Sequence, residues 1–276
     1  MTGPSDQDEI SEFYRSHHDA IVDKRERSPH WTRRFAYVGI QERMCRQVEE
    51  GARVLDAGCG EGSLAFRLEG RAGSVVGVDL SQPNVEAAAR RGGERRSTAA
   101  FAVSDLSRLP FPDGAFDVVT CSHVIEHVPD PDAALRELRR VTGGYAVIAM
   151  PTCFSPVAPF LLGGVTYWHP SRRSLVAPWV GIAKIVVALI RRRPGPQEGY
   201  GGRHDLPHVW RFPWRMIRLV EDAGFRVTHV EGGPFVLPYV GERSKAARRL
   251  QEALSQRSDR WPMRWLGYGT HLVVRP

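Results

Sequence analysis

Residues 54–62 read Val-Leu-Asp-Ala-Gly-Cys-Gly-Glu-Gly, and the run Val-Val-Gly-Val-Asp follows at residues 75–79. Each apolar run ends in an acid, and a glycine-rich turn follows the first. The pattern predicts a strand, a tight turn, a helix from about Ser63 and a second strand. Glycine lets a ligand approach the backbone closely, and a helix start offers free N–H groups. The stretch therefore predicts a ligand site at the ends of two neighbouring strands.

The glycines follow the spacing Gly-x-Gly-x-Gly rather than the dinucleotide fingerprint Gly-x-Gly-x-x-Gly. The segment Asp-Ala-Gly-Cys-Gly-Glu-Gly at 56–62 resembles the first motif of class I S-adenosylmethionine-dependent methyltransferases. Further downstream, Ser-Asp-Leu stands at 104–106 and Cys-Ser-His-Val-Ile-Glu-His-Val-Pro-Asp at 121–130. Together these motifs resemble the subfamily that includes ubiquinone and menaquinone biosynthesis methyltransferases. The resemblance covers roughly 50–152 and resumes at 204–231.

This resemblance implies S-adenosylmethionine as the cofactor. Asp56 and the glycine turn would hold its methionine part, Asp79 its ribose hydroxyls and Asp105 its adenine amino group. Asp105 could instead serve only as a turn acid, because aspartate is common in turns, and Tyr14 only as a core aromatic. The complete set of expected cofactor-binding residues is Tyr14, Asp56, Gly58, Gly60, Asp79, Leu80, Asp105, Leu106, Ser122 and His123.

The alternation of strands with helices predicts an α/β fold with a doubly wound, mostly parallel sheet. By resemblance it is a seven-stranded, Rossmann-like class I methyltransferase sheet, with N-terminal helices and an inserted helical lid. A final antiparallel pair is expected at 225–230 and 270–274. The expected organisation is an N-terminal helical cover at 1–50, a cofactor-binding core at 51–152, an inserted segment at 153–207, and the remainder of the core at 208–276.

Positive charge is concentrated in residues 170–215, where nine basic and two acidic residues account for the whole formal net charge of +7. The same segment holds an almost wholly apolar run at 175–190, too short for the ~20 residues that span a bilayer. The run predicts a helix, for which three roles remain open: a lid over the acceptor site, a contact with a membrane interface through 175–193, or an ordinary core helix.

Methyl transfer to a hydroxyl can use a general base, and histidine titrates nearest neutral pH. His127 and His208 are the catalytic residues that we expect from their motif positions. The segment His-Val-Ile-Glu-His at 123–127 also spells an inverted zinc-protease pattern, but the methyltransferase resemblance accounts for it. The sequence offers no third ligand at a fixed spacing, so no metal is expected. The full set of candidate bases is His123, His127, His169, His204 and His208.

The sequence thus predicts an enzyme that moves a methyl group to a small or lipophilic acceptor, with oxygen as the preferred nucleophile. One alternative is a peripheral membrane enzyme acting on a quinone or another lipid, and another is a cofactor-binding protein without enzymatic activity. Nucleic acid is not expected as a partner, despite a pI near 9.6, because no recognition motif accompanies the charge. The absence of a signal peptide and of Cys-x-x-Cys pairs predicts a cytoplasmic protein. The oligomeric state stays open.

Overall fold

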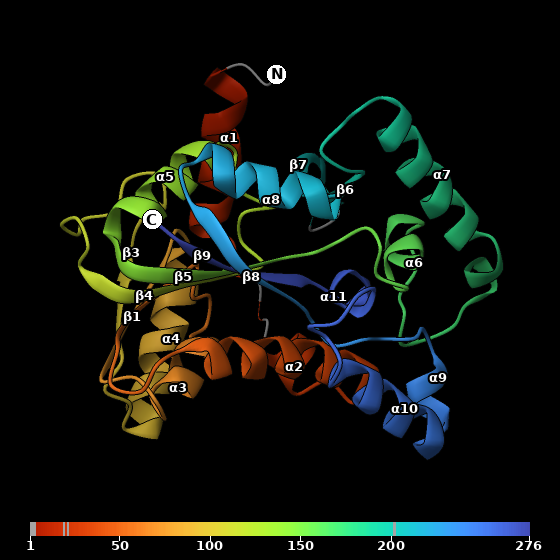
Figure 1. Cartoon of the computed structure of the whole chain (residues 1–276), viewed down its shortest axis with the longest axis horizontal. Helices are drawn as coiled ribbons and strands as arrows, with labels where there is room; N and C mark the ends of the chain where they lie inside the picture. Colours follow the sequence, from red (N-terminus) through yellow and green to blue (C-terminus); the bar gives the residue numbers. More distant parts are fainter. Residues whose placement is uncertain (1–3, 19, 21, 201–202) are drawn as a thin grey trace.

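A seven-stranded sheet with the order β3-β2-β1-β4-β5-β9-β8 forms the centre of the chain (Figure 1). The computed structural model describes residues 4–18, 20, 22–200 and 203–276. Strands β1 to β5 are parallel, and β9 pairs antiparallel with both β5 and β8. This topology confirms the predicted Rossmann-like class I methyltransferase sheet. The strands are β1 Arg53–Ala57, β2 Ser74–Asp79, β3 Ala100–Val103, β4 Phe116–Ser122, β5 Thr142–Met150, β8 Arg226–Gly232 and β9 Thr270–Arg275.

Alternate residues of the central strands enter two separate hydrophobic cores, because successive side chains in a strand point to opposite faces. On β1, Val54 packs with helices α2 and α3, whereas Leu55 packs with α5 and α8. The sheet is therefore covered on both faces, as a parallel sheet requires. The main flanking helices are α2 Trp31–Gln47, α3 Ser63–Leu68, α4 Gln82–Arg95, α5 Pro131–Val141 and α8 Pro213–Asp222.

The N-terminal region is helical, as expected for residues 1–50, and its helices are interrupted between Glu26 and Trp31. Helix α1 spans Pro4–Ser16, a π-helical turn spans Val22–Glu26, and α2 begins at Trp31. The carboxylate of Glu242 accepts hydrogen bonds from the main-chain N–H groups of Trp31 (3.2 Å) and Thr32 (2.7 Å). These bonds satisfy N–H groups at the start of α2, which have no partner within the helix.

The segment between β5 and α8 contains helices and also a β-hairpin that the sequence analysis did not anticipate. It comprises α6 Ala158–Leu162, a 3₁₀ turn Arg172–Leu175, α7 Ala177–Ile190, and the antiparallel strands β6 Gln197–Tyr200 and β7 Arg203–Val209. Helix α7 packs against α6 and lies on its far side from the central sheet (Figure 1). Gly181 permits this close packing, because a Cβ there would lie 2.0 Å from the main-chain oxygen of Pro159.

Three short helices between β8 and β9 were also not anticipated. They are α9 Val240–Arg243, α10 Lys245–Ser255 and α11 Met263–Leu266. Within the part of the chain that the structure describes, no helix is long and apolar enough to cross a membrane.

Candidate functional site

The glycine turn after β1 forms the floor of the site. Gly58 and Gly60 have φ values of +79° and +52°, in the left-handed region that favours glycine. A Cβ at Gly58 would lie 2.2 Å from the side chain of Val124, so a larger residue could not be accommodated without a shift. The N–H groups of Gly58 and Cys59 both donate to the main-chain oxygen of Val78, at 2.8 and 2.9 Å. The turn is thereby fixed between β1 and β2.

Asp56, the last acid of β1, is buried with one carboxyl oxygen unsatisfied. Its Oδ1 accepts a hydrogen bond from Thr120 Oγ1 at 3.0 Å, whereas Oδ2 has no hydrogen-bond partner among the described residues. Burial, with a smaller contribution from the charge of Asp79, raises the pKa of Asp56 to about 7. A buried carboxyl oxygen without a donor is costly. A ligand that brings an ammonium group, such as the methionine part of S-adenosylmethionine, would satisfy it.

Asp79, at the end of β2, lies between two main-chain donors. Its Oδ2 accepts from the N–H of Gly60 at 2.8 Å, and its Oδ1 accepts from the N–H of Ser81 at 2.9 Å. These bonds hold the carboxylate at the rim of the glycine turn, where a ribose diol would meet it.

Asp105 stabilises the turn after β3, because its Oδ1 accepts hydrogen bonds from the N–H and Oγ of Ser107. It nevertheless lines the same cavity as Asp79.

The N-terminal helical region closes one side of this cavity through hydrogen bonds to the glycine turn and to the turn after β2. Glu61, in the glycine turn, accepts hydrogen bonds from the N–H of Val22 (2.8 Å) and contacts His18 Nε2 at 2.9 Å. Ser81 Oγ donates to the main-chain oxygen of His17 at 2.6 Å. Tyr14 on α1 lines the cavity, and its Oη lies 3.3 Å from Nδ1 of His127.

Opposite the cofactor turns, the cavity is lined by an acid and several imidazoles. Residues 123–128 form an irregular turn after β4 rather than a helix, and His123 has φ of +56°. His123 and His127 are therefore not on one helix face, as the zinc-protease pattern would require. The main-chain N–H of Val209 approaches the oxygen of Glu126 at 3.4 Å and brings the end of β7 beside this turn.

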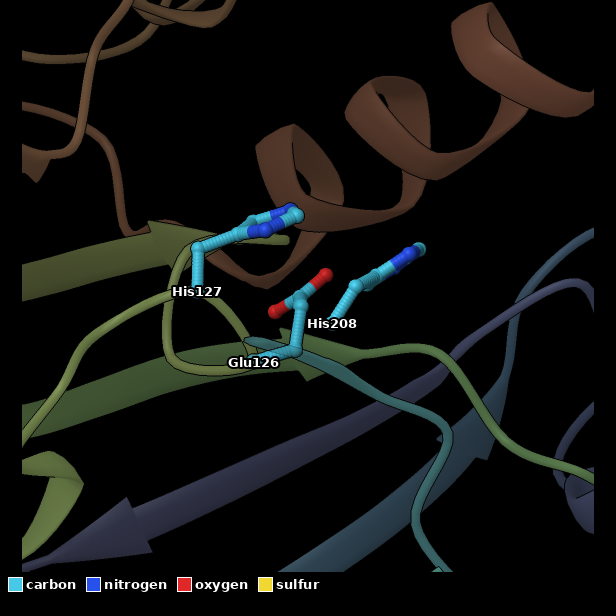
Figure 2. A group of neighbouring side chains, drawn as sticks. All are labelled: Glu126, His127 and His208. Atoms are coloured by element: carbon cyan, nitrogen blue, oxygen red, sulfur yellow. The ribbon is translucent and has the colours of Figure 1, made fainter. Parts of the chain in front are cut away.

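This arrangement places His208 against His127, although 80 residues lie between them in sequence. Their rings stack with centroids 4.7 Å apart and planes 20° apart, and the carboxylate of Glu126 lies beside the pair (Figure 2). Burial is the main cause that lowers the pKa of His208 to about 3, and the neighbouring His127 is the second cause. Burial opposes ionisation of Glu126, but its contact with His123 and the other imidazoles lower its pKa to about 2. Near neutral pH the site thus presents a neutral His208 beside an ionised acid.

All twelve residues that we expected from the sequence line one cavity. The structure adds residues that the sequence analysis did not assign, including Arg25, Tyr37, Trp210 and Tyr268. Trp210 lies within the segment 204–231 where the resemblance resumes, two residues after His208, whereas Arg25, Tyr37 and Tyr268 come from segments without a recognisable motif. Among the other candidate bases, His169 does not line the cavity and the side chain of His204 lies outside the described residues. Helix α7 contributes no lining residue, so in this structure it is not placed over the acceptor side.

Comparison with known proteins agrees with this geometry. A family model described as a methyltransferase domain matches residues 55–148. The chain contains a class I S-adenosylmethionine-dependent methyltransferase domain. The matched residues run from β1 into β5 and include the glycine turn, Asp79, Asp105 and His127. The cofactor of this domain is S-adenosylmethionine, as the motif resemblance implied.

Curated relatives of the methyltransferase domain include two proteins named for quinones. The chain is 40% identical over 119 residues to a 2-phytyl-1,4-naphtoquinone methyltransferase of Synechococcus elongatus, which covers 40% of this chain and 50% of the relative. It is 35% identical over 103 residues to a ubiquinone biosynthesis O-methyltransferase of Alkalilimnicola ehrlichii. This match covers 36% of this chain and 42% of the relative. The chain thus spans about half or less of the length of the curated relatives it matches.

A solved structure covers nearly the whole fold. The S-adenosylmethionine-dependent methyltransferase of Thermotoga maritima, titled a possible histamine N-methyltransferase, superposes with a TM-score of 0.58. The match covers 92% of this chain and 96% of that chain at 17% sequence identity. At this identity the likeness supports the fold and carries no information about the acceptor.

Proposed function

We propose that this protein transfers a methyl group from S-adenosylmethionine to a hydroxyl oxygen of a small, lipophilic acceptor. The observation that carries the proposal is the shared cavity, in which the cofactor acids Asp56 and Asp79 and the imidazoles of His127 and His208 line opposite parts. The quinone methyltransferase names of the curated relatives support a lipophilic acceptor. Val124, Val128 and other apolar groups line the same cavity and would favour such a molecule.

Each group has a distinct role in this proposal. The cofactor supplies a methyl group on a sulfonium, and the glycine turn with Asp56 and Asp79 holds it in position. Correct positioning of two reactants can provide much of the rate enhancement. His127 and His208 hold the acceptor hydroxyl, and His127 assists its deprotonation. His208 is suited to accept a hydrogen bond, because burial keeps its imidazole neutral near neutral pH.

A methyl-transfer assay with labelled cofactor tests the proposal, using hydroxylated aromatic acceptors with and without isoprenoid tails. We expect a methoxy product, preferentially from tailed acceptors. His127→Ala and His208→Ala should each lower kcat/KM by about 10²–10⁴-fold, the usual contribution of proton-transfer groups, without a comparable loss of cofactor affinity. His229→Ala, at an exposed position on β8, is the matched control. A product methylated at carbon or nitrogen would refute the choice of oxygen, and cofactor binding without any transfer would favour the non-enzymatic alternative.

We further propose that the protein collects its acceptor at a membrane surface. Helix α7 and the turn before it expose large apolar side chains, with Leu175 of the turn 81% and Trp179 and Ile190 of the helix 70% and 74% accessible to solvent. We call the exposed side chains of 175–193 the α7 surface. Contiguous apolar surface of this kind marks an interaction site in soluble proteins.

The charges at the two ends of the α7 surface specify an anionic partner. Arg172 and Arg173 are exposed before the helix, and residues 191–193 are three exposed arginines after it. An apolar helix face bordered by arginines fits the interface of an anionic bilayer, with the apolar side chains in the acyl boundary and the guanidinium groups at phosphates.

A further inference from the structure

We propose that Glu126, His127 and His208 bind one divalent transition-metal ion, with Zn²⁺ as the preferred ion. This inference rests on the proposed function, because the ion would lie where the acceptor hydroxyl is expected. One ligand atom of each of the three side chains lies within 4.8 Å of the others. Figure 2 shows the carboxylate of Glu126 beside the stacked rings, so the three groups lie at one place in the cavity. Two imidazoles and a carboxylate are a ligand set found in catalytic zinc sites.

The neighbours of the two imidazoles indicate which nitrogen would bind the ion. A metal-ligating histidine usually donates its other ring N–H to an oxygen, which fixes the ring. Tyr14 Oη lies 3.3 Å from Nδ1 of His127, and Glu198 Oε2 lies 3.9 Å from Nδ1 of His208. His127 would therefore bind through Nε2, whereas the separation of 3.9 Å at His208 is too long for a hydrogen bond and leaves either of its ring nitrogens as the ligand. Because the rings are stacked with planes 20° apart, they would turn about their Cβ–Cγ bonds to point one nitrogen each at a shared ion.

The environment of Glu126 is the second, independent observation. Its side chain is 1% exposed, and neither carboxylate oxygen has a hydrogen-bond donor among the described residues. Among the described residues its one ion contact is with His123 Nδ1 at 3.2 Å, and His123 also lines the cavity. The buried Arg211 also acts on Glu126 electrostatically, but no contact within 4 Å joins them in the described part of the chain. The imidazoles near Glu126 compensate part of the cost of its burial, and a bound cation would supply the partner that its two oxygens lack.

The ligand set also selects among ions. Mg²⁺ and Ca²⁺ prefer oxygen ligands, whereas imidazole suits Zn²⁺ and other transition metals. Three protein ligands leave a fourth position open on a tetrahedral ion. The acceptor hydroxyl would replace a water molecule at that position, and its proton would pass to solvent. The ion would lower the pKa of the bound hydroxyl, as it does for bound water. The histidines would then activate the acceptor as metal ligands.

Titration of the metal-free protein with Co²⁺ alone tests the site without cofactor or acceptor. The protein is first dialysed against a chelator, and binding is followed by the visible absorption of the bound ion. Competition with a chromophoric chelator then gives the Zn²⁺ affinity. We expect one ion per chain. His127→Ala, His208→Ala and Glu126→Gln should each weaken binding by more than about 100-fold, since loss of even an indirect partner costs 10–100-fold. His229→Ala should leave it unchanged.

Calorimetry with S-adenosylmethionine on the same variants verifies that the cofactor half of the cavity remains folded. No stoichiometric binding by the native protein, or binding that His208→Ala does not weaken, would overturn the metal site. Full methyl transfer by the chelator-treated enzyme would also overturn it and would leave the proposed function intact. Stoichiometric, variant-sensitive Co²⁺ binding without methyl transfer to any acceptor would support the site and count against the proposed function.

Discussion

The carboxylate of Glu61, in the glycine turn, accepts a hydrogen bond from the main-chain N–H of Val22 at 2.8 Å. Glu61 also contacts His18 at 2.9 Å, so one side chain of the cofactor turn is joined twice to the N-terminal segment that closes the cavity. Closure of this segment and order in the glycine turn are therefore coupled. This coupling predicts that a residue outside the catalytic groups controls cofactor retention.

Glu61→Ala should weaken cofactor binding by about tenfold or more. A hydrogen bond to a charged group contributes about 1.5–3 kcal/mol, and 1.4 kcal/mol corresponds to a factor of ten. Calorimetry gives the affinity, and hydrogen exchange over residues 10–27 reports the opening of the segment. Glu94→Ala removes an exposed acid on α4 and is the control. Unchanged affinity with unchanged exchange would show that the segment closes independently of Glu61.

Asp79→Ala should lower the affinity for S-adenosylmethionine by roughly 1.5–3 kcal/mol, because it removes a charged partner for the ribose hydroxyls. The same carboxylate accepts from the N–H groups of Gly60 and Ser81, so the variant also loosens the turn. Asp79→Asn separates the two effects, since an amide oxygen can still accept one of these bonds. Calorimetry that finds both variants equal to the native protein would refute the assignment of Asp79.

Asp56 predicts a dependence of stability on pH in the cofactor-free protein. Its folded-state pKa of about 7 is above the ~3.9 of an unfolded aspartate, mainly because of burial. The folded state therefore holds its proton more tightly than the unfolded state. The resulting stabilisation is complete below about pH 4 and is lost as the pH rises through about 7.

Asp56→Asn should be insensitive to this titration. Relative to the native protein, the variant should gain stability between about pH 4 and 7, by up to about 4 kcal/mol if the whole shift is expressed. Chemical denaturation of both proteins at pH 5 and pH 8 measures the difference and cancels the other titrating groups. The two proteins losing stability in parallel would show that Asp56 is ionised in the folded state. We also expect the variant to bind the cofactor more weakly, because the ammonium group loses its charged partner.

Much of this fold could be predicted from the sequence because its signals are local. Apolar runs that end in Asp56 and Asp79 mark strands, and the glycines between them mark the turn. Parallel strands bring their carboxyl ends to one edge of the sheet, so residues assigned one motif at a time meet in one cavity. The antiparallel pair β8 and β9 was predicted for the same reason, from two short apolar runs.

The parts that were not predicted depend on contacts between distant segments. The hairpin of β6 and β7 contains Gly199 and Pro207, and such residues weaken a strand signal. The stacking of His127 on His208 follows from a main-chain contact of Val209 that no periodicity reveals. The expectation of no metal rested on the lack of a third ligand at a fixed spacing. In the structure the third candidate ligand is His208, which the main-chain contact between Val209 and Glu126 brings beside His127.

The α7 surface predicts salt-sensitive binding to anionic vesicles. Each exposed arginine near an anionic membrane contributes about 1 kcal/mol, and salt screens this attraction. Changing Arg191, Arg192 and Arg193 to Ser should therefore weaken vesicle binding by about 3 kcal/mol, or roughly 100-fold, at low salt. Vesicle sedimentation at low and high salt measures this loss. Changing Arg249, Arg257 and Arg260 to Ser removes the same charge elsewhere on the surface and should have a much smaller effect.

The apolar part of the α7 surface has its own test. Trp179→Ser should reduce vesicle binding at both low and high salt. The substitution removes apolar area that the membrane would bury and leaves the charge unchanged. Leu250→Ser removes an exposed apolar side chain on α10 and should not reduce vesicle binding.

If the two triple Arg→Ser variants lose the same vesicle affinity, the protein is attracted by its overall charge and does not dock through α7. A second copy of the chain could cover the same face, and a dimer that Trp179→Ser dissociates, without vesicle binding, would contradict the membrane proposal. Because α7 does not line the cavity, all these variants should retain the cofactor affinity of the native protein.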